Sequence, residues 1–132
     1  MIEIPVKIHT EDRRGDIVTL LEPLAVKWRR KSFTVPAGFE CDGVSVPRFA
    51  WPLVTPKIDP RSLRAGICHD YIHRIQPPGW TRKEDDQMFL CFLIEDGLSV
   101  PRAATAYTAV RWFGAGAWRA NARFKAERES VK

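Results

Sequence analysis

The amino-acid sequence predicts an α+β fold with a small N-terminal antiparallel β-sheet, a long proline-rich loop and a helical half of three to four helices. Three observations lead to this prediction. Apolar and polar residues alternate in residues 1–35, prolines recur in residues 36–59, and helix caps and helical apolar spacing mark residues 60–127. Because the chain has only 132 residues, we expect the three parts to form one domain, residues 1–132.

The β-rich part contains several short runs with strand character. Residues 2–8 alternate with period two, and residues 17–21, 25–28 and 32–36 are rich in apolar and β-branched side chains. These runs predict one antiparallel sheet of three or four strands. The loop over residues 36–59 has a length that is typical of functional loops in compact domains.

The first two predicted helices form a pair. Pro60 suits the first turn of a helix that runs to about residue 74, and residues 76–79 end it with two prolines and a glycine. Thr81 and Glu84 have the spacing of a capping box, which opens a second helix that ends at Gly97. Since their connection is short, we expect these two helices to pack antiparallel.

Two further helices are expected in the last third of the chain. Ser99 is a suitable N-cap for a helix that reaches about residue 113, where Gly114 and Gly116 interrupt it. A fourth helical stretch follows over about residues 117–127, with a solvated tail beyond it.

Composition limits the class of protein. Lys and Arg number 21 against 16 Asp and Glu, which gives a net charge of +5, and there are five tryptophans. A basic surface with tryptophans is typical of proteins that meet nucleic acid or an anionic membrane, and a solvated face of mixed charges is the alternative. The three cysteines have no C-x-x-C spacing, so we expect free thiols and a reducing compartment rather than a disulfide framework or a zinc ribbon.

The strongest group of chemically active residues lies on the predicted helix pair. His69 and His73 are four residues apart on the first helix, so they share a face, and Asp70 follows His69 directly. Asp85 and Asp86 lie about four residues past the cap of the second helix. In an antiparallel pair these carboxylates can meet either histidine.

Three interpretations of this group compete. His69 could be a general base oriented by a carboxylate, with Asp70 binding a metal. His69 and His73 could instead bind zinc in an H-x-x-x-H pattern that resembles H-E-x-x-H, with no third ligand evident downstream. The third interpretation is a structural hydrogen-bond network that holds the helices together.

A second group lies in the loop. Asp42 and Gly43 form a turn dipeptide, and Pro47 keeps the preceding residue extended. The Asp42 carboxylate and loop carbonyls are candidate oxygen ligands for Ca²⁺. The alternative is that Asp42 caps a turn and Arg48 forms a surface ion pair.

Together the two groups resemble a family of small proteins of unknown function from tailed phages and prophages. The family pattern is D-G-x-S-x-P-R, then H-D-Y-x-Y, then A-D-x-x-F, then A-V-R-x-F-G-x-x-x-W. The resemblance covers about residues 35–118 and places Ser45, Arg48 and Tyr71 beside the His/Asp group. The matching segments are Asp42 to Arg48, His69 to His73, Asp85 to Phe89, and Ala109 to Gly114 with Trp118.

The helix pair is also similar to the core of phospholipase A2, most closely to the versions in parvovirus capsid proteins. That resemblance implies that His69 is the general base, that Asp70 ligates Ca²⁺ and that Asp86 orients His69. His73 stands where both families usually have tyrosine, and Asp85 stands where the small residue of A-D is expected.

These resemblances imply a surface that meets anionic membrane lipid. The residues expected to face it are Trp51, Trp80, Arg48, Arg74 and Arg82. Trp112 and Trp118, on the third and fourth helices, are expected to pack in the core.

The leading hypothesis from the sequence is a phage-related protein with a phospholipase A2-like His/Asp site. Such a protein would be a metal-assisted lipid esterase that acts at the host membrane. The expected metal is Ca²⁺, and Zn²⁺ is the alternative. The competing hypothesis is a non-catalytic tail or baseplate component, and a zinc-dependent cell-wall hydrolase comes third. The expected partners are anionic lipid or other phage structural proteins, and not nucleic acid. A phage origin implies synthesis in the host cytoplasm.

Overall fold

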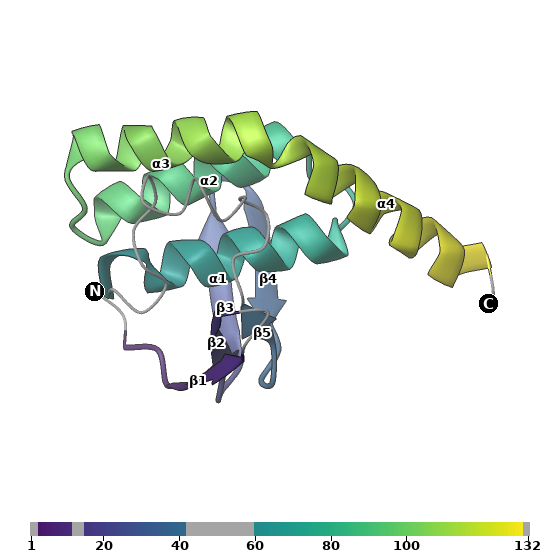
Figure 1. The fold of residues 1–132 in the computed structure, drawn as a ribbon, viewed down its shortest axis with the longest axis horizontal. Helices are drawn as coiled ribbons and strands as arrows, with labels where there is room; N and C mark the ends of the chain where they lie inside the picture. Colours follow the sequence, from purple (N-terminus) through teal and green to yellow (C-terminus); the bar gives the residue numbers. More distant parts are fainter. Residues whose placement is uncertain (1–2, 12–14, 42–59, 131–132) are drawn as a thin grey trace.

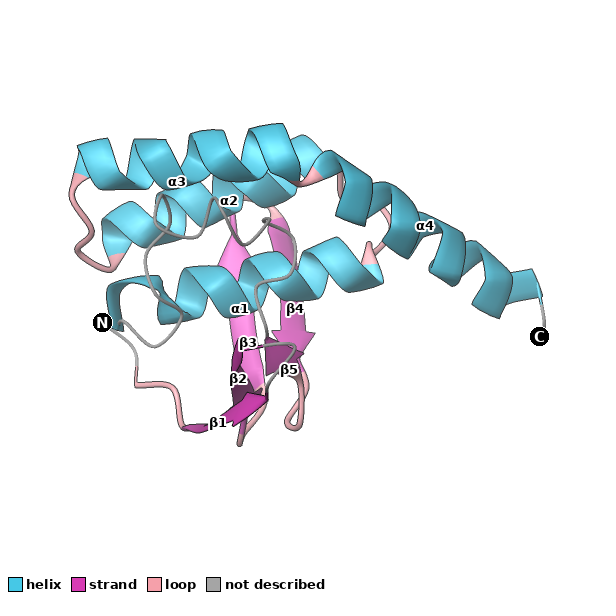
Figure 2. Cartoon of the chain, in the orientation of Figure 1, coloured by secondary structure: helices cyan, strands magenta, loops and turns pink. Residues whose placement is uncertain are grey.

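The computed structural model describes residues 3–11, 15–41 and 60–130, and these ranges form an α+β fold as predicted. Strands and helices are segregated along the chain, with the strands first (Figures 1 and 2). The strands are β1 (Val6–Glu11), β2 (Gly15–Leu20), β3 (Leu24–Trp28), β4 (Lys31–Val35) and β5 (Glu40–Cys41). The helices are α1 (Pro60–Ile75), α2 (Arg82–Glu95), α3 (Val100–Phe113) and α4 (Ala115–Ser130).

The strands form two small antiparallel sheets rather than the single sheet predicted. In the described residues, one sheet has the order β1-β2-β5 and the other pairs β3 with β4. The residues between β2 and β3 form a bend that ends the first sheet, and β5 lies inside the range predicted to be loop. Alternation of residues identified the strands, but pairing depends on contacts between distant residues, which periodicity does not encode.

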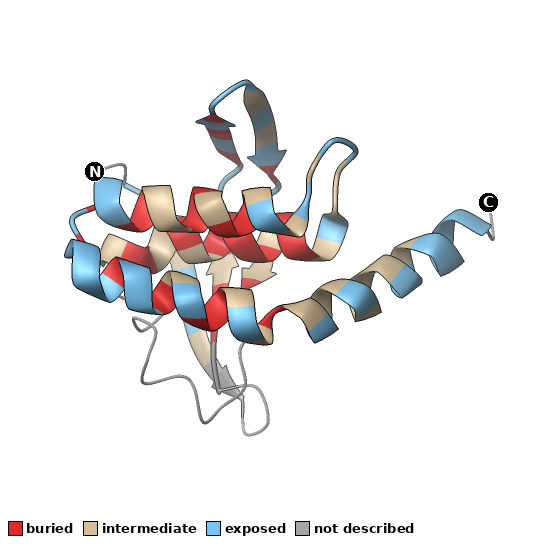
Figure 3. Cartoon of the chain, turned by 90° about the horizontal axis from the view of Figure 1, so that it is seen from above, coloured by how far each residue is buried: buried red, intermediate tan, exposed pale blue. Residues whose placement is uncertain are grey.

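The helices pack in a layer against the strands. α1 and α2 are antiparallel neighbours, and α3 packs on α2 (Figure 1). One continuous core joins the inner faces of the strands and helices, with Val18, Val35, Ile72 and Phe92 almost completely buried. Figure 3 shows this buried stripe along α1, α2 and α3.

Local sequence signals set the helix ends. Thr81 caps α2: its hydroxyl accepts a hydrogen bond from the Glu84 amide, and the Glu84 carboxylate accepts one from the Thr81 amide, which confirms the predicted capping box. Ser99 occupies the N-cap position of α3 without a side-chain capping bond. The fourth helix is longer than predicted, since it begins at Ala115.

Gly114 forms the joint between α3 and α4, from which α4 projects away from the helical layer (Figure 1). A Cβ atom at Gly114 would lie 2.6 Å from the carbonyl oxygen of Val110, so a larger residue would force the backbone apart. α4 contains no fully buried residue. It is held at its base by Gln76 and Asn121, whose side chains bond the Trp118 and His73 carbonyls respectively.

Candidate functional site

The antiparallel helix pair brings His69 and Asp86 into direct contact, as the sequence predicted. Nε2 of His69 lies 2.7 Å from Oδ1 of Asp86, a distance typical of a charge-assisted hydrogen bond. His69 is 4% exposed and Asp86 is fully buried. α1 contributes the imidazole and α2 the carboxylate, so packing of the two helices fixes the pair without any loop.

Two arginines hold the other oxygen of Asp86. Nη1 of Arg111, from α3, lies 2.8 Å from Oδ2, and Nη1 of Arg82 lies 3.3 Å from the same atom. Arg82 also donates to the carbonyls of Val110 and Arg111 at the end of α3. Asp86 is therefore the point at which α1, α2 and α3 are joined through charged groups.

These contacts determine the charge of the pair. Burial alone would raise the pKa of Asp86, but the hydrogen bond and charge of His69, together with Arg111 and Arg82, lower it. Burial would lower the pKa of His69, but the charge of Asp85 and the bond to Asp86 outweigh it and raise the pKa to about 9. The Asp86 carboxylate is therefore ionised at neutral pH and stabilises a protonated imidazole.

His73 and Asp85 lie beside this pair and have a different environment. Nδ1 of His73 is 3.4 Å from Oδ2 of Asp85, and Nε2 of His69 is 3.7 Å from the same oxygen. Within the described residues, neither ring nitrogen of His73 and neither carboxylate oxygen of Asp85 has a hydrogen-bond partner, although all four atoms are buried. Buried polar groups in native proteins are rarely left in this state.

Burial dominates the titration of both residues. It lowers the pKa of His73 to about 4, with the charge of His69 acting in the same direction. The charge of Asp86 opposes this shift, and so does the Gly114 backbone, which lies outside hydrogen-bond geometry. Burial raises the pKa of Asp85 well above its ordinary value, against the attraction of His69. Burial thus favours a neutral His73, whereas the carboxyl group of Asp85 is subject to two opposing effects: burial favours its neutral form and the charge of His69 favours its ionised form.

The His73 shift predicts an acid-sensitive fold. A histidine with a pKa of about 6.5 when unfolded and about 4 when folded supplies stability above pH 6.5 that is lost as the pH falls through 4. The loss amounts to roughly 3 kcal/mol. In chelator, the free energy of unfolding of the wild type should fall relative to that of His73→Gln as the pH decreases from 6.5 to 4, while the raised pKa of Asp85 acts in the opposite direction in both proteins. His9→Gln is the control, and an equal slope in all three proteins would contradict the assignment.

Asp70 and Tyr71 do not join the His69–Asp86 pair. Oδ2 of Asp70 accepts a hydrogen bond of 2.7 Å from Arg74, one helical turn later. The Tyr71 ring packs between Phe33 and Phe39, in an aromatic cluster on the sheet side of α1. The other predicted site residues, Asp42, Ser45 and Arg48, lie outside the described residues, as does Trp51.

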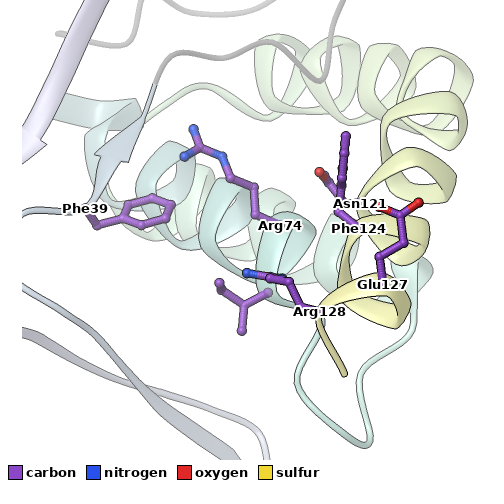
Figure 4. Close-up of a pocket in the computed structure, with 7 residues that line it drawn as sticks. Phe39, Arg74, Asn121, Phe124, Glu127 and Arg128 are labelled. Carbon is purple, nitrogen blue, oxygen red and sulfur yellow. The ribbon is translucent and has the colours of Figure 1, made fainter. Parts of the chain in front are cut away.

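A groove opens at the far end of α1 (Figure 4). Its volume is about 740 Å³, and it lies between the end of α1, the outer part of α4 and Phe39. Arg74, which bonds Asp70, projects into it. The groove is lined by Phe39, Arg74, Ile75, Asn121, Phe124, Glu127 and Arg128.

The tryptophans are placed differently from the prediction. Trp112 is 77% exposed rather than buried, because it lies on the outer face of α3. Trp80, expected at a lipid surface, stacks on Trp28 and meets Phe33 edge-on. Trp118 packs against the His73 ring, with centroids 5.3 Å apart. Arg82, also expected at the surface, is instead turned inward to Asp86.

Sequence reasoning missed the role of Arg111. The A-V-R segment belongs to the fourth motif, but the motif assigns no role to its arginine, which makes the shorter of the two arginine contacts to Oδ2 of Asp86. Its distance of 25 residues from Asp86 hides this pairing from local patterns. Cys41, Cys68 and Cys91 form no disulfide bond in the structure. Among the described helices, none is both long and apolar enough to cross a membrane.

Comparison with known proteins identifies the family but no activity. No curated protein and no solved structure gives a significant match to the chain. A family model described as "Protein of unknown function (DUF1353)" matches residues 18–110. This range contains the end of β2, β3 to β5, the helix pair and most of α3, and therefore His69, His73, Asp85 and Asp86. The chain belongs to this family, DUF1353, whose function is unknown.

Proposed function

We propose that this protein is a hydrolase of ester bonds in which His69 activates water and Asp86 orients His69. The observation that carries the proposal is the 2.7 Å contact between Nε2 of His69 and Oδ1 of Asp86, whose second oxygen is held by Arg111. A histidine paired with a buried, ionised carboxylate is the arrangement that general-base catalysis requires.

The contacts assign each atom of the pair a task. Because Nε2 of His69 faces the carboxylate, it carries the hydrogen, and Nδ1 retains the lone pair that can take a proton from water. Asp86 then stabilises the imidazolium that forms. Since the pKa of His69 is raised to about 9, the fraction of neutral base, and with it the rate, should increase between pH 7 and pH 9.

A lipid ester is the substrate class that we favour. The groove beside Arg74, which His69 does not line, combines the apolar side chains of Phe39, Ile75 and Phe124 with two cationic residues and one acidic residue, Arg74, Arg128 and Glu127. Its apolar and cationic side chains suit acyl chains with an anionic headgroup. Trp112 adds an exposed aromatic side chain on α3. The similarity of the H-D helix to the phospholipase A2 core supports the same substrate class.

Ca²⁺ binding by Asp70 has less support than the pairing of His69 with Asp86. Of the two predicted ligands, Asp70 is described and its carboxylate already bonds Arg74. Ca²⁺ takes six to eight oxygen ligands, and the loop predicted to supply the others lies outside the described residues. Ca²⁺ is therefore a variable of the assay below and not part of the proposed step.

The test is hydrolysis of vesicles of anionic phospholipid, with and without Ca²⁺, followed by release of fatty acid. His69→Gln should lower the rate by about 10²–10⁴-fold, the usual contribution of a general base. His9→Gln, which changes a histidine of β1, should hydrolyse lipid at the wild-type rate. Equal background release from all proteins, with or without Ca²⁺, would refute the proposal.

A structural component of a phage tail or baseplate is the second candidate. The near-complete burial of His69, at 4% exposure, favours it, because a purely structural network would also be enclosed. In that case His69→Gln would lower the melting temperature without changing any hydrolytic rate. The two candidates thus predict different outcomes in the same pair of proteins.

A further inference from the structure

A second constellation, distinct from the His69–Asp86 hydrogen bond, centres on one oxygen of Asp85. Oδ2 of Asp85 lies 3.4 Å from Nδ1 of His73 and 3.7 Å from Nε2 of His69. Ligand atoms from His69, His73 and Asp85 all lie within 4.8 Å of one another, and all three residues are buried. The two histidines come from successive turns of α1 and the aspartate from the first turn of α2.

These separations match the edges of a metal coordination sphere. Zinc binds imidazole nitrogen and carboxylate oxygen at about 2.0–2.2 Å in a tetrahedron, which places neighbouring ligand atoms roughly 3.3–3.6 Å apart. The observed 3.4 Å and 3.7 Å are therefore close to the values that a bound ion requires. The third pair of ligand atoms, which belongs to the two histidines, lies within 4.8 Å.

The hydrogen-bond inventory points to the same conclusion. Both nitrogens of His73 and both oxygens of Asp85 are buried without a hydrogen-bond partner among the described residues. Each buried polar group without a hydrogen-bond partner lowers the stability of the fold by about 1–3 kcal/mol. A cation at the centre of the group would satisfy the carboxylate and one nitrogen of each imidazole together.

The chemistry of the donors selects the ion. Two imidazoles and one carboxylate suit Zn²⁺ and its transition-metal neighbours, whereas Ca²⁺ and Mg²⁺ prefer sets made of oxygen. Apolar rings cover the histidines, with Phe89 4.9 Å from His69 and Trp118 5.3 Å from His73 between ring centroids. Such an apolar shell lowers the local dielectric constant and strengthens the binding of a charged ion to its ligands.

We propose that His69, His73 and Asp85 form a binding site for a divalent transition metal, with Zn²⁺ as the best-fitting ion. Nε2 of His69 cannot hold a metal and donate a hydrogen to Asp86 at the same time. Metal binding through this nitrogen and the His69–Asp86 pair are consequently exclusive states of one imidazole. The site thus adds a means of regulation, in which the metal blocks the base.

Binding is tested on the full chain after removal of metal with a chelator. Titration with Co²⁺ should produce the intense visible absorption of a tetrahedral complex, and Zn²⁺ should displace it at one ion per chain. His73→Gln and Asp85→Asn should each weaken Zn²⁺ binding at least about 100-fold, as loss of one of three ligands implies. His9→Gln should bind as the wild type does.

Two results would overturn the proposal. One is a folded wild type, verified by circular dichroism, that gives no Co²⁺ spectrum and no Zn²⁺ binding. The other is Zn²⁺ binding of equal strength in the wild type and in folded Asp85→Asn. Asp85→Asn keeps the shape of the side chain while removing its charge and one oxygen. It therefore tests the site even if His73→Gln does not fold.

The proposed regulation by metal rests on the proposed function, and it is tested separately by the effect of Zn²⁺ on the rate of hydrolysis. In the lipid assay, stoichiometric Zn²⁺ should lower the wild-type rate at least about tenfold, as expected when most of the base is bound. The ratio of rates with and without Zn²⁺ should approach one in His73→Gln, whatever its basal rate. Metal binding without any hydrolysis would refute the proposed hydrolase function and leave the metal site established. Undiminished hydrolysis by the zinc-bound wild type would refute only the proposed regulation.

Discussion

Replacing Asp86 with asparagine should lower the rate of ester hydrolysis by about 10⁴-fold while the helices stay in place. Asparagine has nearly the same shape as aspartate, but it cannot stabilise an imidazolium, and its amide can hold His69 in the wrong tautomer. Losses of about this size follow the same change in other histidine–carboxylate pairs. The measurement is fatty-acid release from anionic vesicles at saturating substrate, together with its dependence on pH.

Asp96→Asn is the matched control for this experiment. Asp96 is also a buried carboxylate at the α1–α2 interface, and it accepts two hydrogen bonds from Arg64, of 3.0 and 3.1 Å. It lies at the other end of α2 from Asp86 and does not contact His69. Asp96→Asn should lower stability and preserve the rate, so equal losses of activity in the two variants would show that Asp86 acts only through the fold.

Removal of the Asp86 carboxylate should lower the free energy of unfolding, whereas removal of the neighbouring Asp85 carboxylate should raise it. Asp86→Ala leaves Arg82, Arg111 and a protonated His69 without their common partner, which should cost about 3–5 kcal/mol. Asp85→Leu removes a buried carboxylate that no donor satisfies in the metal-free protein, which should add about 1–3 kcal/mol. Leucine keeps the branched shape at that position.

Thermal unfolding in the presence of chelator measures both effects. For a domain of this size, Asp86→Ala should lower the melting temperature on the order of 10–20 °C, and Asp85→Leu should raise it by several degrees. Addition of Zn²⁺ should stabilise the wild type and leave Asp85→Leu unchanged. A lower melting temperature for Asp85→Leu in chelator would mean that Asp85 already has a stabilising partner without metal.

The opposite signs have a common physical origin. Asp86 accepts hydrogen bonds from three side chains that carry positive charge, and these interactions compensate the cost of burying its carboxylate. Asp85, one residue earlier, is equally buried and receives no hydrogen bond within the described structure. A fold that retains such a group loses stability in the absence of a ligand, which is the pattern expected of a binding site rather than of a structural network.

Much of the candidate site followed from local spacing. The i, i+4 relation placed His69 and His73 on one face of α1, and the capping box fixed where α2 begins, so Asp85 and Asp86 fell opposite them. The short turn between the helices required an antiparallel pair. The structure confirms these steps because each depends on helix geometry and on a few neighbouring residues.

Other predictions failed where distant contacts decide the outcome. Trp112 has an apolar side chain on a helix and was assigned to the core, yet its face of α3 has no neighbouring element in the described structure. The strands were identified, but their division into two sheets was not, because pairing is chosen by the packing of the helices and turns around them. The same holds for the inward turn of Arg82.

The sequence by itself determined the α+β class, a helical half of three to four helices, and the membership of His69 and Asp86 in one group. These features arise from periodicity, caps and spacing, which act over a few residues. Only the tertiary structure decided which nitrogen meets which oxygen, that Arg111 completes the pair, and that Asp85 supplies a third ligand atom beside the two histidines. Those outcomes depend on the angle and register at which three helices pack, and a shift of one turn would have brought different side chains together.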